Sequence, residues 1–144
     1  MGQQTYDPAK VTANVAGINV TQFAKGTFIT VEYESDAFSD EGGAGGEVGR
    51  VRSADERGTI KFTIMAASPS NDALSALAAL DRLTGKGVGP AQVKDVTGTS
   101  LHSSESAWVK RIPSKPYSTE PGDTVEWEIR CAKLKHNVGG TVSA

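Results

Sequence analysis

Two short stretches decide the fold: TFITVEY at residues 27–33 and TIKFTIM at residues 59–65. In both, apolar and polar side chains alternate, which is typical of β-strands that bury one face. The connection between them, residues 35–58, is rich in glycine and charge. A connection this long with no regular structure of its own is usually functional or disordered. We therefore predict a protruding hairpin arm at residues 35–58, carried by two strands and responsible for contact with a partner.

Length and composition narrow the class of protein. A chain of 144 residues fits one domain, residues 1–144, that can bury its own core. The 15 basic and 17 acidic side chains give a net charge of −2, without a basic cluster. This argues against a protein that grips nucleic acid through its phosphates. A single cysteine excludes an internal disulfide, and we expect neither a signal sequence nor a membrane span, hence a soluble protein made in a cytoplasm.

The rest of the chain reads mostly as strands. Residues 11–15 and 18–21 alternate around Gly17 and predict a hairpin, and further strands are expected at residues 93–97, 106–112 and 124–132. One helix is predicted at residues 69–84, between Ser68-Pro69 and Gly85. Its sheet-facing stripe is expected to contain Ala73, Ala76, Leu77, Leu80 and Leu83. The polar tail, residues 133–144, is read as a late-docking end. The predicted fold is mainly β, an antiparallel sandwich or barrel with one flanking helix.

The strand at residues 124–132 has two contrasting faces. Val125, Trp127, Ile129 and Cys131 share one face, because side chains alternate across a strand. The opposite face carries Glu126, Glu128 and Arg130. We predict that the first face is core and that the second meets water.

The sequence contains no specific motif of a catalytic or ligand site. The glycine-rich runs at residues 42–49 and 85–89 match neither a dinucleotide fingerprint nor a Walker loop. His102, His136 and Cys131 show no metal-ligand spacing, and the GTSLH sequence at residues 98–102 lacks the second glycine of a nucleophile elbow. We therefore predict no enzyme activity, no cofactor and no metal site.

The order of motifs resembles a known family. The motifs are GRVRSADERGT at residues 49–59, SPSNDALS at residues 68–75, VKD at residues 93–95, Trp108, and the Trp127 strand that closes towards Gly139-Gly140. Together they are similar to the proteins that form the tail tube of contractile-tailed bacteriophages. The likeness covers most of the chain, from about Tyr6 to Gly140.

The resemblance implies a homo-oligomer of hexameric rings, stacked into a hollow tube through which DNA passes without specific binding. Implied partners are the tail sheath, the baseplate or tail-initiation proteins and the terminator, and the implied location is the virion tail, assembled in the host cytoplasm. Inner strands of such a subunit would turn a polar face to the lumen, where acidic groups would repel phosphates. The lumen-facing candidates are Glu126, Glu128, Arg130, Thr59, Lys61, Thr63, Thr30 and Glu32.

The same resemblance gives the arm a role between rings. Its glycines would leave it disordered in the monomer and let it order on assembly. Basic groups of one copy would then meet acidic groups of another. The inter-ring candidates are Asp36, Asp40, Glu41, Glu47, Arg50, Arg52 and Arg57.

Two alternatives remain open at this point. Tubes of contractile injection or secretion systems would share the architecture and carry effectors in place of DNA. A β-sandwich binding module would instead use Trp108, Trp127 and Tyr117 as stacking platforms, which requires these aromatic rings to be exposed near one site.

Overall fold

One antiparallel sheet organises the molecule. The computed structural model describes residues 7–119 and 122–140. The strand order is β2-β1-β7-β8-β9-β6-β3, and β10 also pairs with β8. The strands are β1 (Val11–Val15), β2 (Ile18–Val20), β3 (Ile29–Tyr33), β6 (Gly58–Met65), β7 (Gly89–Asp95), β8 (Leu101–Arg111), β9 (Thr124–Cys131) and β10 (Lys135–Asn137). A 3-10 turn, η1 (Pro8–Lys10), precedes β1.

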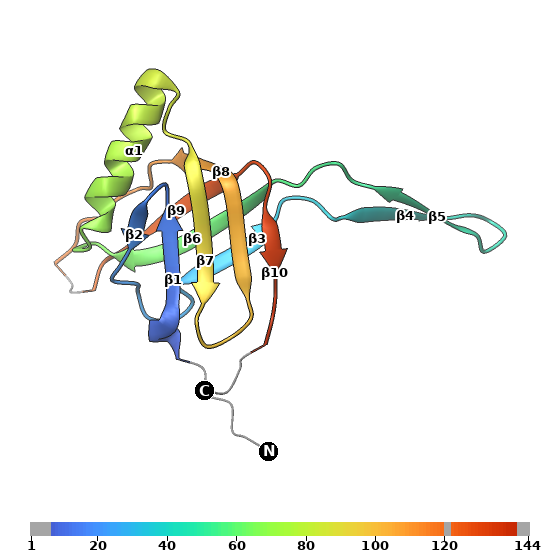
Figure 1. Ribbon diagram of the computed structural model, residues 1–144, viewed down its shortest axis with the longest axis horizontal. Helices are drawn as coiled ribbons and strands as arrows, with labels where there is room; N and C mark the ends of the chain where they lie inside the picture. Colours follow the sequence, from blue (N-terminus) through green and yellow to red (C-terminus); the bar gives the residue numbers. More distant parts are fainter. Residues whose placement is uncertain (1–6, 120–121, 141–144) are drawn as a thin grey trace, which may run out of the picture.

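The sheet bends over itself and encloses the core. In Figure 1, β1, β7 and β8 cross over β9, β6 and β3. Side chains from both halves form one buried cluster, in which Phe62 and Trp127 are register partners on β6 and β9. The alternation read from the sequence explains this core, because every second residue of β9 is buried. The predicted mainly antiparallel β fold with one helix is therefore confirmed.

The first hairpin also follows its sequence. β1 and β2 pair with Val15 opposite Ile18, which leaves a two-residue turn. Both turn residues, Ala16 and Gly17, have positive φ angles of 50° and 86°. Such a turn twists in the same sense as the strands it joins. Gly17 is the glycine that the sequence marked as the turning point.

The single helix, α1 (Ser70–Thr84), turns a different face to the sheet than predicted. It ends at Gly85, whose φ is 69°. Leu74 is fully buried, and Leu77 and Ala78 pack against the core, whereas Leu80 and Leu83 are 48% and 85% exposed. Of the predicted stripe, Leu77 does pack against the core, whereas the prediction is wrong for Ala76, Leu80 and Leu83, which are exposed. The helix rises beyond the edge of the sheet (Figure 1), which leaves Leu80 half exposed and Leu83 largely in water.

Polar sequence concealed two stretches of sheet. β8 begins at Leu101, well before the predicted start at residue 106, and β10 lies in the tail that was read as polar. β10 pairs with the first residues of β8, and His136 lies opposite His102. These two strands were not recognised from the sequence, because many of their side chains point into water and are therefore hydroxyl or charged groups. Residues 141–144 of the predicted tail lie outside the described residues.

The arm is an ordered hairpin. β4 (Phe38–Gly42) and β5 (Val48–Arg52) form a separate two-stranded sheet that extends far from the body (Figure 1). Every residue of both strands is exposed. The predicted protruding hairpin arm is therefore confirmed. Its two strands pair in register without a core beneath them, so the arm is not the disordered segment that was expected in the monomer.

A polar sheet face and a projecting arm

The eight residues predicted to face a lumen come together on three neighbouring strands. Between β3 and β6, Thr30 is opposite Lys61 and Glu32 is opposite Thr59. Between β6 and β9, Thr59 is opposite Arg130, Lys61 is opposite Glu128 and Thr63 is opposite Glu126. Directly opposite residues point to the same side of a sheet. All eight therefore share one face, which we call the polar face.

Ion pairs cover much of the polar face. Lys61 Nζ is 3.6 Å from Glu32 Oε1, and Lys110 Nζ is 3.6 Å from Glu128 Oε2. Arg130 pairs with Glu34. Lys61, Lys110 and Arg130 thus each have a carboxylate partner within the subunit. The result is a mixed and nearly balanced surface instead of an acidic one.

Individual positions on the polar face differ in exposure. Thr59 is only 4% exposed and lies 3.5 Å from Glu34 Oε2 through its hydroxyl, so it supports the face without reaching solvent. Glu126, in contrast, is exposed, and no cation of the described chain pairs with it. Sequence reasoning missed Glu34 and Lys110. Glu34 continues the alternation of Thr30 and Glu32, which was the available signal.

The arm has two unlike faces. Cross-strand partners place Phe38 beside Arg52 and Asp40 beside Arg50. The guanidinium of Arg50 lies 4.2 Å from the centre of the Phe38 ring, which confirms that both side chains are on one side. Ser39 and Val51 face the other side. In the described chain Arg50 and Arg52 make no ion pair, so their charges stay available for a partner.

Other predicted arm residues are used within the arm. Glu47 Oε2 accepts a hydrogen bond from the Gly45 backbone at 3.2 Å and thereby shapes the tip. Arg57 holds Asp55 through two hydrogen bonds, Nε to Oδ1 at 2.9 Å and Nη2 to Oδ2 at 3.0 Å. These bonds keep the pKa of Asp55 well below its usual range. Arg57 is thus a component of the arm's base, and Asp55 is a residue that sequence reasoning missed.

The remaining two predicted arm acids differ in their positions. Asp36 precedes β4 and Glu41 lies on it, and both are exposed. In the described chain neither makes an ion pair. Both carboxylates can therefore reach a partner.

The aromatic side chains do not converge on a shared site. Trp127 is 2% exposed and belongs to the core, whereas Tyr117 is 85% exposed in the loop after β8. The Lys115 ammonium lies 5.2 Å from the Tyr117 ring centre. Trp127 cannot act as a stacking platform, so the binding-module alternative loses one of its three aromatic residues.

Cys131 is buried on the apolar face of β9, and this burial raises the pKa of its thiol. Among residues 7–119 and 122–140, no three His, Cys, Asp or Glu side chains gather in a way that could hold a metal ion. No helix within the same residues is long and apolar enough to cross a membrane.

Comparisons with known proteins identify relatives of the whole chain. Residues 4–139 match the family described as Bacteriophage PhiTE tail tube protein. "Structural protein ORF10" of Pseudomonas phage KPP10 is 29% identical over 144 residues, which cover 94% of this chain and 83% of that protein.

Two solved structures share the fold at low sequence identity. The cap of the anti-feeding prophage, described as a tube terminating cap, has a TM-score of 0.67 at 8% identity, covering 96% of this chain and 94% of that chain. The sheath/tube terminator of the extracellular contractile injection system PVC, in its extended state, has a TM-score of 0.65 at 9% identity, covering 94% of this chain and 99% of that chain.

The family match spans nearly the full length and confirms the resemblance read from the motifs. This chain belongs to the Bacteriophage PhiTE tail tube protein family.

Proposed function

We propose that this chain is the structural, non-enzymatic subunit of a phage tail tube, in which hexameric rings stack into a hollow conduit for DNA. Membership of the tail tube protein family supports the assignment to a tube. The observation that carries the finer proposal is the polar face, where charged residues of β3, β6 and β9 gather on one side of the sheet and the core lies on the other. A wall between protein interior and an aqueous channel requires this division.

The charge arrangement of the polar face suits passage of DNA. Tight binding to DNA needs several cations that neutralise phosphates and release counterions. Here Lys61, Lys110 and Arg130 each face a carboxylate of the same subunit. The unpaired Glu126 would add repulsion towards phosphates. A lumen lined in this way would let DNA slide without adhering to the wall.

Ring closure would use the two ends of the sheet. Within the described residues, β2 pairs only with β1 and β3 pairs only with β6, so each has one unpaired edge. Unpaired edges invite association with other chains, and a closed head-to-tail ring satisfies them without runaway growth. The whole chain would act as one tail-tube domain within such a ring.

Stacking of rings is the role proposed for the arm. It leaves the body at the end where β3 finishes and β6 begins, and it carries the free cations Arg50 and Arg52 together with the acids Asp36 and Glu41. These groups would meet charges on the next ring. The tube would further contact sheath, tail-initiation or baseplate, and terminator proteins, within a virion tail assembled in the host cytoplasm.

Electron microscopy tests this proposal directly. The purified full-length protein is imaged at high concentration, alone and mixed with the tail-initiation complex of its source. Rings or hollow tubes with sixfold symmetry are expected. A protein that remains monomeric under both conditions would overturn the tube proposal.

A second candidate is a tube of a contractile injection system that carries effectors. The fold shared with the two terminator structures favours considering it. Purified particles decide between the two functions: nucleic acid in the particle supports the phage tube, and protein cargo in the lumen supports the alternative.

A further inference from the structure

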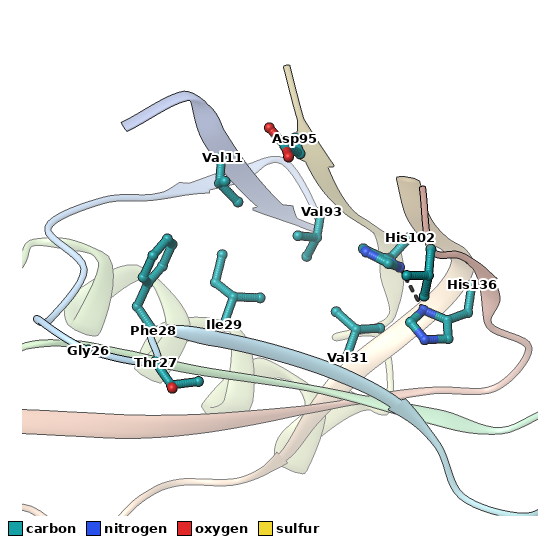
Figure 2. Close-up of a pocket in the computed structure, with 11 residues that line it drawn as sticks. Val11, Gly26, Thr27, Phe28, Ile29, Val31, Val93, Asp95, His102 and His136 are labelled. Atoms are coloured by element: carbon teal, nitrogen blue, oxygen red, sulfur yellow. Dashed lines mark hydrogen bonds between the residues drawn. The ribbon is translucent and has the colours of Figure 1, made fainter. Parts of the chain in front are cut away.

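The two histidines of the sequence, separated by 34 positions, are direct neighbours in the fold. His102 on β8 and His136 on β10 are register partners of an antiparallel pair. Their Nδ1 atoms are 2.6 Å apart, and their ring centres are 4.6 Å apart (Figure 2). These are the only two histidines in the sequence.

The two facing Nδ1 atoms need either a proton or a metal cation between them. A neutral imidazole carries one N–H, so one Nδ1 can donate to the other only when the two rings adopt different tautomers. Two unprotonated Nδ1 lone pairs at 2.6 Å would repel each other. The same convergence of two nitrogen donors is what a metal ion with imidazole ligands requires.

Neighbouring groups influence the position and the protonation of the two imidazole rings. The Tyr33 ring meets His136 edge-on, with ring centres 5.5 Å apart and planes at 79°. The Tyr33 hydroxyl is itself fixed by donating to the Leu134 carbonyl at 2.9 Å. Burial lowers the pKa of His102, and its neighbour His136 adds to this effect. The unprotonated form of His102, which is the form that binds metals, is therefore favoured near neutral pH.

A cavity beside the pair provides space for the remaining ligands. It has a volume of about 430 Å³, and both histidines lie on its wall together with apolar side chains such as Ile29, Val31 and Val93 (Figure 2). Both imidazoles are only partly buried. Water molecules can therefore reach the outer side of an ion held between them.

We propose that His102 and His136 bind one divalent cation of the zinc, nickel and copper class through their Nδ1 atoms, with water completing the coordination. Imidazole is a preferred ligand for these ions. At Zn–N distances of about 2.0–2.1 Å and tetrahedral angles, the two nitrogens would lie about 3.4 Å apart. The rings must therefore separate by less than about 1 Å, which small side-chain rotations of two partly exposed residues can supply.

The protein supplies two ligands, so the site should be weaker than a four-ligand structural site. Asp95 lies on the same cavity wall, but its Oδ1 already accepts two hydrogen bonds from Thr97. The expected consequence of binding is local: the ion would clip β10, which has only three residues, to β8. This inference concerns the isolated subunit and does not depend on tube assembly.

Isothermal titration of the full-length protein with ZnCl₂ at pH 7.5, in a buffer that does not bind zinc, tests the site. One ion per chain is expected. His102→Gln and His136→Gln should each weaken binding at least tenfold, whereas Ser103→Gln, on the neighbouring position of β8, should leave it unchanged. Absence of binding to the folded wild type, or equal binding by the His102→Gln/His136→Gln double variant, would overturn the proposal.

Nitrogen NMR of the imidazoles decides the matter if a variant fails to fold. The wild type gives signals from only two histidines, so assignment is direct. Zinc should shift both Nδ1 resonances, and EDTA should reverse the shift. Imidazole signals that stay unchanged at saturating zinc would show that the pair holds a shared proton and no metal.

Discussion

The indole Nε1 of Trp127 donates a hydrogen bond to Oδ1 of Asn71, 2.9 Å away. This bond joins the centre of β9 to the first turn of α1. The amide nitrogen of Asn71 lies 3.1–3.2 Å from the backbone carbonyls of Met65, Ala66 and Ser68. One side chain thus satisfies the buried indole and also fixes the turn that leads from β6 into the helix.

Asn71→Ala should destabilise the protein. It leaves the Trp127 N–H without a partner in the core, and an unsatisfied buried donor costs about 1–3 kcal/mol. Urea unfolding measures the change. Asn71→Asp keeps the acceptor for Trp127 and loses the amide donors, so an intermediate effect is expected. An Asn71→Ala variant as stable as the wild type would contradict this role.

Leu74 and Leu83 test which face of the helix meets the sheet. Leu74→Ala should cost about 2–5 kcal/mol, because it opens a cavity in the core. Leu83→Ala should change the free energy of unfolding by no more than about 0.5 kcal/mol, since its side chain is largely in water. The same urea titrations measure both. The reverse order of effects would favour the helix stripe predicted from the sequence.

Deletion of residues 42–49 should abolish long tubes without unfolding the subunit. The tip of the arm is exposed throughout, so the core loses nothing with it. Circular dichroism checks the fold, and electron microscopy measures tube length. Reversing the arm cations with Arg50→Glu and Arg52→Glu should shorten tubes as well, whereas Lys86→Glu, beyond the helix, serves as the matched control. Tubes of normal length after the deletion would rule out an inter-ring role.

Replacing Glu126 and Glu128 with lysine should slow DNA ejection while rings still assemble. The change adds two cations to the polar face and leaves Lys110 without its partner, so phosphates gain sites to bind. Glu105→Lys, an exposed position on β8, is the control. Ejection is followed by the fluorescence of a dye that binds released DNA. The delay should diminish at high salt, and unaltered ejection kinetics would argue against a lumen position for these residues.

Stability should decrease as the pH falls below the ordinary histidine pKa of 6.5. Burial lowers the pKa of His102 in the folded protein, so the unfolded chain binds the proton more readily. The stabilisation is therefore complete above pH 6.5 and is lost progressively below it. Melting temperatures at pH 7.5, 6.0 and 5.0, in buffers containing EDTA, measure this. His102→Gln should flatten the profile, and parallel profiles for the two proteins would contradict the prediction.

Local patterns predicted those elements whose environment repeats along the chain. β9 and the part of β6 from Ile60 onward bury every second side chain, and the alternation is visible because each residue's burial there depends on its parity in the strand. The β1–β2 turn is readable because its two-residue loop needs positive φ angles, which Gly17 supplies. The protruding hairpin arm was visible as a long polar interruption between two strands, although the pairing of β4 with β5 was not.

Local patterns could not predict which face of α1 packs on the sheet, nor the strands whose sequences are polar. The leucines of α1 recur every three residues and so drift around the helix, and only the position of the sheet edge decides that Leu74 is buried while Leu83 is in water. The first half of β8 and all of β10 are polar in sequence, because much of their surface meets solvent and pairing through the backbone leaves no mark on residue type.

The alternating strands, the turn at Gly17, the helix and the arm can be predicted from local sequence, since each depends on neighbours close along the chain. Which charges meet depends on contacts between distant segments. Register across β3, β6 and β9 gathers Glu32, Lys61 and Glu128 on one face, and the pairing of β10 with β8 brings His136 to His102. Contacts of this kind depend on strand order and register, which are set by packing of the whole core and not by local sequence.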